Sequence, residues 1–179
     1  MNSGTASRRL FFAIWPDAVE QQSIHAAFEP HIRATGGRSI PARNLHITLA
    51  FLGSVPSERI DTVNAIADRV GPIGKIDLAF ERVELWRRSR VLVLLSRTVP
   101  CALRELVERL HFNLLNEQFE VGREEYRPHL TLARDARHSL TIELPRPIEC
   151  SFVRFALVES KNSAAGSIYS NLHNWELIQ

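Results

Sequence analysis

The chain has 179 residues, of which 45% are hydrophobic and 23% charged, a balance that fits one globular domain or two lobes sharing a core and excludes disordered and fibrous chains. The formal net charge of +2 permits a phosphate-bearing ligand but does not demand one. Two cysteines are too few for a disulfide framework and lack the spacing of a metal site, which fits a reducing compartment.

The first apolar run spans residues 10–15 and is broken by Pro16. It is shorter than the roughly 7–15 apolar residues of a secretory signal and the about 20 of a membrane-spanning helix. We therefore expect a cytoplasmic protein with no membrane partner.

The first half of the chain alternates between strand-like and helix-like patterns. The expected elements are a strand over 10–15, a helix from the capping residue Asp17 to about Ala34, a strand over 45–52 closed by Gly53, and a helix over 57–70. Gly36-Gly37 and Gly71-Pro72 are expected to end the two helices.

The second half predicts two strands over 76–86 and 91–96, joined by the basic turn 87–90. A third helix is expected from Pro100, with an apolar stripe of Leu103, Leu106, Val107, Leu110 and Leu114. Strands over 128–133, 148–160 and 168–178 follow, with a flexible polar turn over 162–167. No low-complexity linker divides the chain, so the order predicts an α+β fold with antiparallel hairpins.

One short internal repeat is present. The segment His46-Ile47-Thr48-Leu49-Ala50 recurs as His129-Leu130-Thr131-Leu132-Ala133, nearly half the chain later. With seven His and seven Thr in the chain, chance predicts only about 0.3 His-x-Thr triplets. Two copies that both continue Leu-Ala are therefore unlikely to be accidental.

Strand geometry gives this repeat a structural meaning. Side chains alternate between the two faces of a strand, so each copy would bury its leucines and present a His and a Thr on the opposite face. If the copies lie in related halves, the two imidazoles would face one another across a groove.

Paired imidazoles suit the cleavage of a phosphodiester. With an unperturbed pKa near 6.5, one imidazole can take a proton from the attacking hydroxyl while the other gives one to the departing alkoxide. The hydroxyls of Thr48 and Thr131 can donate hydrogen bonds to the non-bridging phosphate oxygens. No metal or other cofactor is required.

Two other interpretations of the histidines stay open. A single His on a strand is usually a hydrogen-bonded structural residue, the interpretation we favour for the five outside the repeat: His25, His31, His111, His138 and His173. A zinc site could use His46 and His129, but catalytic zinc usually needs three protein ligands and structural zinc four. No third ligand is indicated.

At these residues the chain resembles the two-histidine (2H) phosphoesterase superfamily, whose signature is a pair of H-x-T/S-x motifs. The resemblance narrows to the RNA 2′,3′-cyclic phosphodiesterases, once called 2′-5′ RNA ligases. The stretches that support it are Arg9–Pro16 (RLFFAIWP), Asn44–Gly53 (NLHITLAFLG), Arg127–Arg134 (RPHLTLAR), and Leu157–Ser160 (LVES) with Tyr169, Leu172 and Trp175. Together they span almost the whole chain.

The resemblance implies a single domain over residues 1–179, built of two intertwined, pseudo-symmetric lobes. Each lobe would be an antiparallel sheet flanked by helices, with the active-site cleft between the lobes. It also implies hydrolysis of a nucleoside or RNA 2′,3′-cyclic phosphate to the 2′-phosphomonoester, with reversible 2′-5′ RNA ligation at the same site. His46 would be the proton donor and His129 the proton acceptor, with Thr48 and Thr131 on the phosphate; exchanging the two histidine roles would give the other isomer.

Three further residues have a candidate role in binding substrate. Arg134 matches an arginine that the family places after its second motif, where a guanidinium would bind phosphate bidentately. Strict alternation puts it on the face opposite Thr131, so it must reach over the strand end or follow a bulge. Phe51 and Trp15 could stack on a base, although core packing is the favoured interpretation for both.

The expected partners are RNA or nucleotide 2′,3′-cyclic phosphate ends, bound by a monomer without a cofactor. One alternative is a 2H phosphoesterase for another cyclic phosphodiester, such as an ADP-ribose cyclic phosphate, or for an oligonucleotide 3′ end. Loops 36–43 and 120–126 would decide between these substrates. A second alternative is a non-catalytic RNA-binding module, for which a duplicated His-x-Thr has no evident use.

Overall fold

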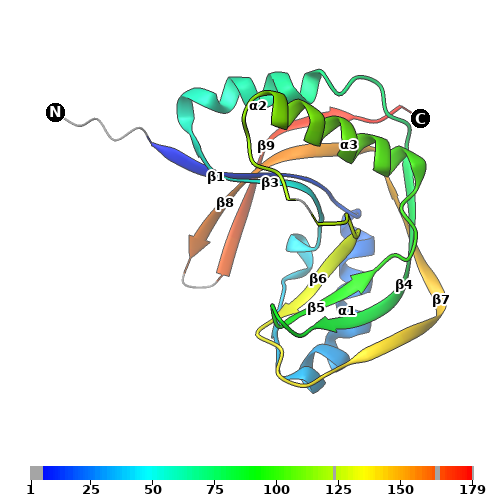
Figure 1. The fold of residues 1–179 in the computed structure, drawn as a ribbon. Coiled ribbons are helices and arrows are strands. Elements are labelled where there is room, and N and C mark those ends of the chain that lie inside the picture. Colours follow the sequence, from blue (N-terminus) through cyan, green and yellow to red (C-terminus); the bar gives the residue numbers. More distant parts are fainter. Residues whose placement is uncertain (1–5, 123, 164–165, 179) are drawn as a thin grey trace.

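The computed structural model describes residues 6–122, 124–163 and 166–178, which form two antiparallel sheets and three α-helices (Figure 1). The first sheet has the order β3-β1-β8-β9, with β1 at Ser7–Ile14, β3 at Ile47–Pro56, β8 at Arg154–Ser163 and β9 at Gly166–Glu176. The second has the order β2-β6-β5-β4-β7, with β2 at Arg38–Ser39, β4 at Ile76–Trp86, β5 at Val91–Leu95, β6 at His129–Arg134 and β7 at Thr141–Phe152. The predicted α+β fold is confirmed.

The helices cover the outer faces of the two sheets. Helices α2 (Ile60–Asp68) and α3 (Cys101–Asn116) lie over the first sheet, and α1 (Ala18–Thr35) lies against the second (Figure 1). Short 3₁₀ turns at Ala42–Asn44 (η1) and Ser57–Arg59 (η2) precede β3 and α2. None of the helices in the described ranges has the length and apolar character needed to cross a bilayer.

The predicted helix ends have clear local causes. Asp17 caps α1 through a capping box with Glu20, in which each side chain accepts a hydrogen bond from the other residue's backbone N–H. Gly36 ends the helix at φ 65°, a left-handed conformation that glycine adopts without a steric penalty. The apolar stripe predicted for α3 is buried at all five of its positions.

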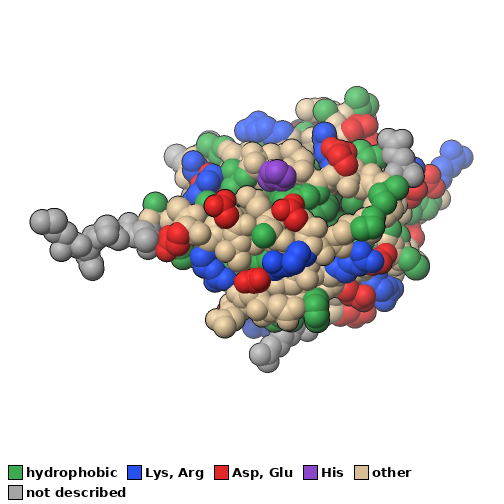
Figure 2. Space-filling view, turned by 90° about the horizontal axis from the view of Figure 1, so that it is seen from above, with side chains coloured by type: hydrophobic (Ala, Val, Ile, Leu, Met, Phe, Trp, Pro, Cys, Tyr) green, Lys and Arg blue, Asp and Glu red, His purple; other side chains and the backbone are tan. Residues whose placement is uncertain are grey.

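One continuous core joins both sheets to the helices. Phe12 of β1, Phe80 of β4 and Leu110 of α3 are all fully buried in it. Because each sheet packs one face on this core, its other face is left to line the space between the sheets. The outward surface that carries α2 and α3 has cationic and anionic side chains interspersed, without a single-signed patch (Figure 2).

Two strand boundaries differ from the prediction at the start of the chain. Strand β3 begins at Ile47, directly after His46, and it continues through Gly53 to Pro56. Gly53 does not close the strand because it adopts φ 71° at a bulge, where Leu10 pairs with Gly53 and Phe11 with Phe51. The extra residue increases the twist of β3 without ending its pairing to β1.

The strand predicted over 148–160 is two strands, because the chain passes from the second sheet to the first at Val153. Strand β7 also begins earlier, at Thr141, and its two prolines fall in an irregular segment of an edge strand, where a missing N–H is tolerated. Strand β2, which has only two residues, was not predicted. The turn expected over 162–167 is a paired hairpin, with Asn162 opposite Ser167; residues 164 and 165 lie outside the described part of the chain.

The helix α3 offers a matched test of the core. Leu110→Ala should lower the free energy of unfolding by about 2–5 kcal/mol, because Leu110 is fully buried and the truncation leaves a cavity. Leu115→Ala, on the exposed side of the same helix, should change it by about 0.5 kcal/mol or less. Urea titration followed by circular dichroism measures both, and equal losses would contradict this packing.

Candidate active site

The two His-x-Thr segments lie next to one another where the sheets meet. Strand β3 contacts β6 there, with His46 directly before β3 and His129 as the first residue of β6. In both copies the His and the Thr are half-buried, whereas the residues between and after them are buried. The predicted alternation of faces is confirmed in each copy.

The two imidazoles are oriented by the same kind of backbone hydrogen bond. Nδ1 of His46 lies 2.7 Å from the carbonyl oxygen of Asn44, and Nδ1 of His129 lies 2.7 Å from that of Arg127. A carbonyl oxygen only accepts, so Nδ1 carries the hydrogen in both rings. Nε2 is then the nitrogen that can accept or deliver a proton.

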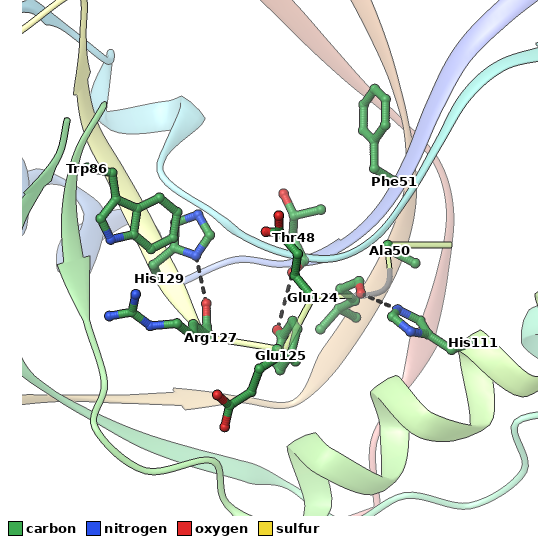
Figure 3. Close-up of a pocket in the computed structure, with 12 residues that line it drawn as sticks. Thr48, Ala50, Phe51, Trp86, His111, Glu124, Glu125, Arg127 and His129 are labelled. Atoms are coloured by element: carbon green, nitrogen blue, oxygen red, sulfur yellow. Dashed lines mark hydrogen bonds between the residues drawn. The ribbon is translucent and has the colours of Figure 1, made fainter. Parts of the chain in front are cut away.

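Aromatic side chains surround both rings. His46 stacks on Trp15 with 5.2 Å between ring centroids, and it contacts Phe11 and Tyr169 at 5.1 Å each. His129 packs on Trp86 at 4.5 Å (Figure 3). These contacts remove water from one side of each imidazole.

Burial and neighbouring positive charge lower the pKa of both histidines. The pKa of His46 falls from its ordinary value of 6.5 to about 4, chiefly because burial disfavours the charged ring, with further lowering by His129 and Arg134. The pKa of His129 is lowered by burial and by the charges of Arg127 and Arg134. The hydrogen bonds to the carbonyls oppose these shifts without cancelling them. Both rings are therefore mostly neutral at pH 7 in the free protein.

Each motif is followed by a one-residue bulge at the same position. In β3, Thr48 pairs with Ala13 and Ala50 with Phe12, which leaves Leu49 as the extra residue. In β6, Thr131 pairs with Val93 and Ala133 with Leu92, which leaves Leu132 as the extra residue. The bulge reverses the alternation after it, so the fifth residue beyond each His returns to the face of the Thr.

Phe51 and Arg134 occupy these two equivalent positions. Of the two routes predicted for Arg134, over the strand end or through a bulge, the structure has the bulge, and the charge of Arg134 acts on both histidines. The core packing favoured for Phe51 is wrong, because the bulge turns its side chain outward and leaves it 49% exposed. Trp15 is half-buried against His46, nearer to the packing role that we favoured.

The carbonyl oxygen of each bulged leucine has a hydrogen-bond donor. Nε2 of His111, on α3, lies 3.0 Å from the Leu49 oxygen, and the Ile40 backbone N–H donates to the Leu132 oxygen at 2.9 Å. The Tyr126 hydroxyl also donates to the Thr48 oxygen at 3.2 Å (Figure 3). His111 is thus a hydrogen-bonded structural residue, as predicted, whereas Tyr126 was missed because no local pattern marks it.

Two cavities meet at the first motif. The larger, of about 680 Å³, lies between the sheets and is lined by Thr48, Leu49, Ala50, Phe51, Trp86, His111, Gly122, Glu124, Glu125, Tyr126, Arg127 and His129 (Figure 3). The smaller, of about 370 Å³, is lined by Arg9, Phe11, His46, Thr48, Phe51, Arg134, Ser160, Asn162, Ser167 and Tyr169. Thr48 and Phe51 belong to both. Thr131 shares a face of β6 with His129 but lines neither cavity.

Chemically, this arrangement offers two proton-transfer groups beside a guanidinium and a hydroxyl. No cluster of three or more His, Cys, Asp or Glu side chains suited to a metal ion occurs within residues 6–122, 124–163 and 166–178.

The chain is similar in sequence and fold to several known proteins. Residues 15–164 match the profile of the 2′-5′ RNA ligase superfamily. The RNA 2′,3′-cyclic phosphodiesterase of Escherichia coli (strain K12) is 34% identical over 96% of this chain and 98% of its own length. The protein of that name from Methanocaldococcus jannaschii is 28% identical over 93% of this chain and 99% of its own. The crystal structure of E. coli LigT complexed with 3′-AMP superposes with a TM-score of 0.88 at 32% identity, covering 97% of this chain and all of that one.

Removal of one guanidinium tests the electrostatics of the site. Arg134→Gln should raise the pKa of His46 above about 4 and also raise that of His129, because a positive neighbour disfavours each imidazolium. Titration of the imidazole carbon-bound protons by NMR measures both values. Arg104→Gln, at an exposed position of α3, should leave both unchanged, and unchanged values in Arg134→Gln would contradict the placement of that side chain.

Proposed function

The chain belongs to the 2′-5′ RNA ligase superfamily, and on this premise we propose that it hydrolyses RNA and nucleoside 2′,3′-cyclic phosphates to 2′-phosphomonoesters. We further propose that it does so without a metal ion or nucleotide cofactor. The observation that carries this proposal is the matched pair of imidazoles, each with Nδ1 bound to a carbonyl, on two adjoining strands. The names of both curated relatives favour RNA ends over an ADP-ribose cyclic phosphate or a purely binding role.

In the proposed reaction, one imidazole receives a proton and the other gives one. Nε2 of His129 takes a proton from water as the water oxygen bonds to phosphorus. Nε2 of His46 gives its proton to the 3′ oxygen as the bond from phosphorus to that oxygen breaks. The product keeps its phosphate on the 2′ oxygen, and the two histidines exchange protonation states. With an RNA 5′-hydroxyl in place of water as the attacking group, the same steps in the same direction join RNA through a 2′-5′ bond.

The phosphate oxygens need donors while charge builds on them. The hydroxyl of Thr48 lies at the junction of the two cavities, and we assign it to one non-bridging oxygen. We assign Thr131 to the other, by its equivalent place in the second motif. The guanidinium of Arg134, close enough to lower the pKa of both histidines, balances the negative charge of the phosphate.

The bound phosphate also changes the protonation of the site. His46 is mostly neutral at pH 7 in the free protein, yet a general acid must carry a proton. A phosphodiester anion beside the ring favours imidazolium and raises its pKa. Binding of the substrate would therefore protonate His46, the general acid that cleavage of this substrate requires.

Alanine variants test the roles of the two histidines. His46→Ala and His129→Ala should each lower kcat/KM for 2′,3′-cyclic AMP by about 10²–10⁴-fold, the usual contribution of one general acid or base. His138→Ala, at an exposed position outside both cavities, should retain full activity. The assay contains EDTA and separates 2′-AMP from 3′-AMP by chromatography. Full activity in His46→Ala, or a product other than 2′-AMP, would refute the mechanism.

The pH dependence follows from the lowered pKa values. One histidine must be protonated and the other neutral, so kcat/KM should be bell-shaped, rising through the lower pKa and falling through the higher. Because both free-protein values lie below 6.5, its maximum should also lie below pH 6.5. The maximum of kcat should lie at higher pH, since bound phosphate raises both values. Initial rates across a constant-ionic-strength buffer series measure this; a kcat/KM maximum above pH 7 would contradict it.

A further inference from the structure

The two cavities that meet at Thr48 differ in charge. Two arginines, Arg9 and Arg134, line the smaller cavity, and none of its described lining residues is acidic. Neither arginine has a carboxylate within ion-pair distance among residues 6–122, 124–163 and 166–178. The larger cavity has two carboxylates, Glu124 and Glu125, against one guanidinium, Arg127, and Trp86 and Tyr126 also line it. An anion is therefore favoured on the Arg9 side and disfavoured on the glutamate side.

The β8–β9 hairpin adds neutral polar groups to the smaller cavity. Ser160 and Asn162 on β8 pair with Tyr169 and Ser167 on β9, which puts all four on one face of the hairpin. All four line the cavity. Strands β8 and β9 run side by side and project as a hairpin from the rest of the sheet (Figure 1). The hairpin provides hydroxyl and amide donors in the same cavity as the guanidinium of Arg9.

An aromatic ring holds Arg9 on the wall of this cavity. Its guanidinium carbon lies 4.8 Å from the centroid of Phe51, a cation–π contact. Stacking on a ring face uses the flat side of the guanidinium and leaves its N–H edges for hydrogen bonds. Since Phe51 lines both cavities, Arg9 lies one side chain away from the point where the cavities meet.

We propose that the smaller cavity binds the phosphodiester that links the terminal nucleotide of an RNA to its upstream neighbour, with Arg9 as the residue that recognises its charge. This inference rests on the proposed function, which places the cyclic phosphate between the histidines. The ribose of such an end has two other substituents, the base and the 5′ phosphodiester, and two cavities share Thr48 beside the reacting phosphate. The base takes the aromatic cavity, where two glutamates would repel a phosphate, and the phosphodiester takes the arginine-lined one.

Such a subsite makes the protein discriminate between RNA ends and single nucleotides. An RNA end fills it, whereas 2′,3′-cyclic AMP leaves it without a phosphodiester. We expect kcat/KM to be about 10- to 100-fold higher for a dinucleotide that ends in a cyclic phosphate, the effect of one charge-assisted hydrogen-bond pair. The salt dependence should also be steeper for the dinucleotide, by a slope of about 0.7 for the one added phosphate contact.

The test compares three substrates: 2′,3′-cyclic AMP, the dinucleotide ApA with a terminal 2′,3′-cyclic phosphate, and the same dinucleotide with an uncharged methylphosphonate linkage. Each is assayed with the wild type, Arg9→Gln and Arg104→Gln over a range of salt concentrations. Arg104 is exposed on α3 and lines neither cavity, so its variant removes an equal charge elsewhere. Circular dichroism melting confirms that each variant is folded.

The expected result is a loss of the dinucleotide advantage in Arg9→Gln, by about 10-fold or more relative to any change with 2′,3′-cyclic AMP, and none in Arg104→Gln. The methylphosphonate linkage should lower kcat/KM of the wild type by the same factor. It should not lower kcat/KM of Arg9→Gln further, because the substitution and the neutral linkage remove the same contact. Equal kcat/KM for all three substrates, or an advantage that survives the neutral linkage, would overturn the subsite. Failure of the wild type to hydrolyse any of them would instead refute the proposed function.

Discussion

The site depends on a one-residue β-bulge that occurs at the same position in β3 and in β6. A regular strand would send the residue three places beyond each Thr to the opposite face of the sheet. The extra residue at Leu49 and at Leu132 returns Phe51 and Arg134 to the face of the threonines. A bulge leaves backbone groups without ladder partners, and here the two leucine carbonyls bond to His111 and to the backbone of Ile40. The interruption is therefore stabilised from outside each strand.

Much of the fold could be predicted because local signals were strong. The α3 stripe, the Asp17 cap and the hairpin of β4 and β5 all follow from periodicity and turn residues, and each is found as expected. The strand crossing at Val153 could not be predicted, since a strand that changes sheets keeps the same apolar pattern throughout. The two-residue β2 is too short to have any pattern.

The candidate site was only partly visible in the sequence. The duplicated His-x-Thr could be found from spacing alone, and alternation placed each His beside its Thr. The outward turn of Phe51 could not be predicted, because a bulge depends on the pairing of β3 with β1 and not on the residues of β3 alone. The contacts of Tyr126 and Arg9 could not be predicted either, because their partners Thr48 and Phe51 lie far from them in the sequence.

The two main-chain oxygens that hold the imidazoles have a consequence for how the site tolerates change. In many enzymes an aspartate fixes the catalytic histidine, and one substitution there scrambles the tautomer. Here the acceptors are the carbonyls of Asn44 and Arg127, which every possible side chain at those positions would still supply. A neutral acceptor also stabilises imidazolium less than a carboxylate does, so each ring parts with its proton more readily. The backbone therefore selects the tautomer of each histidine, and a side-chain substitution at Asn44 or Arg127 leaves the acceptor in place.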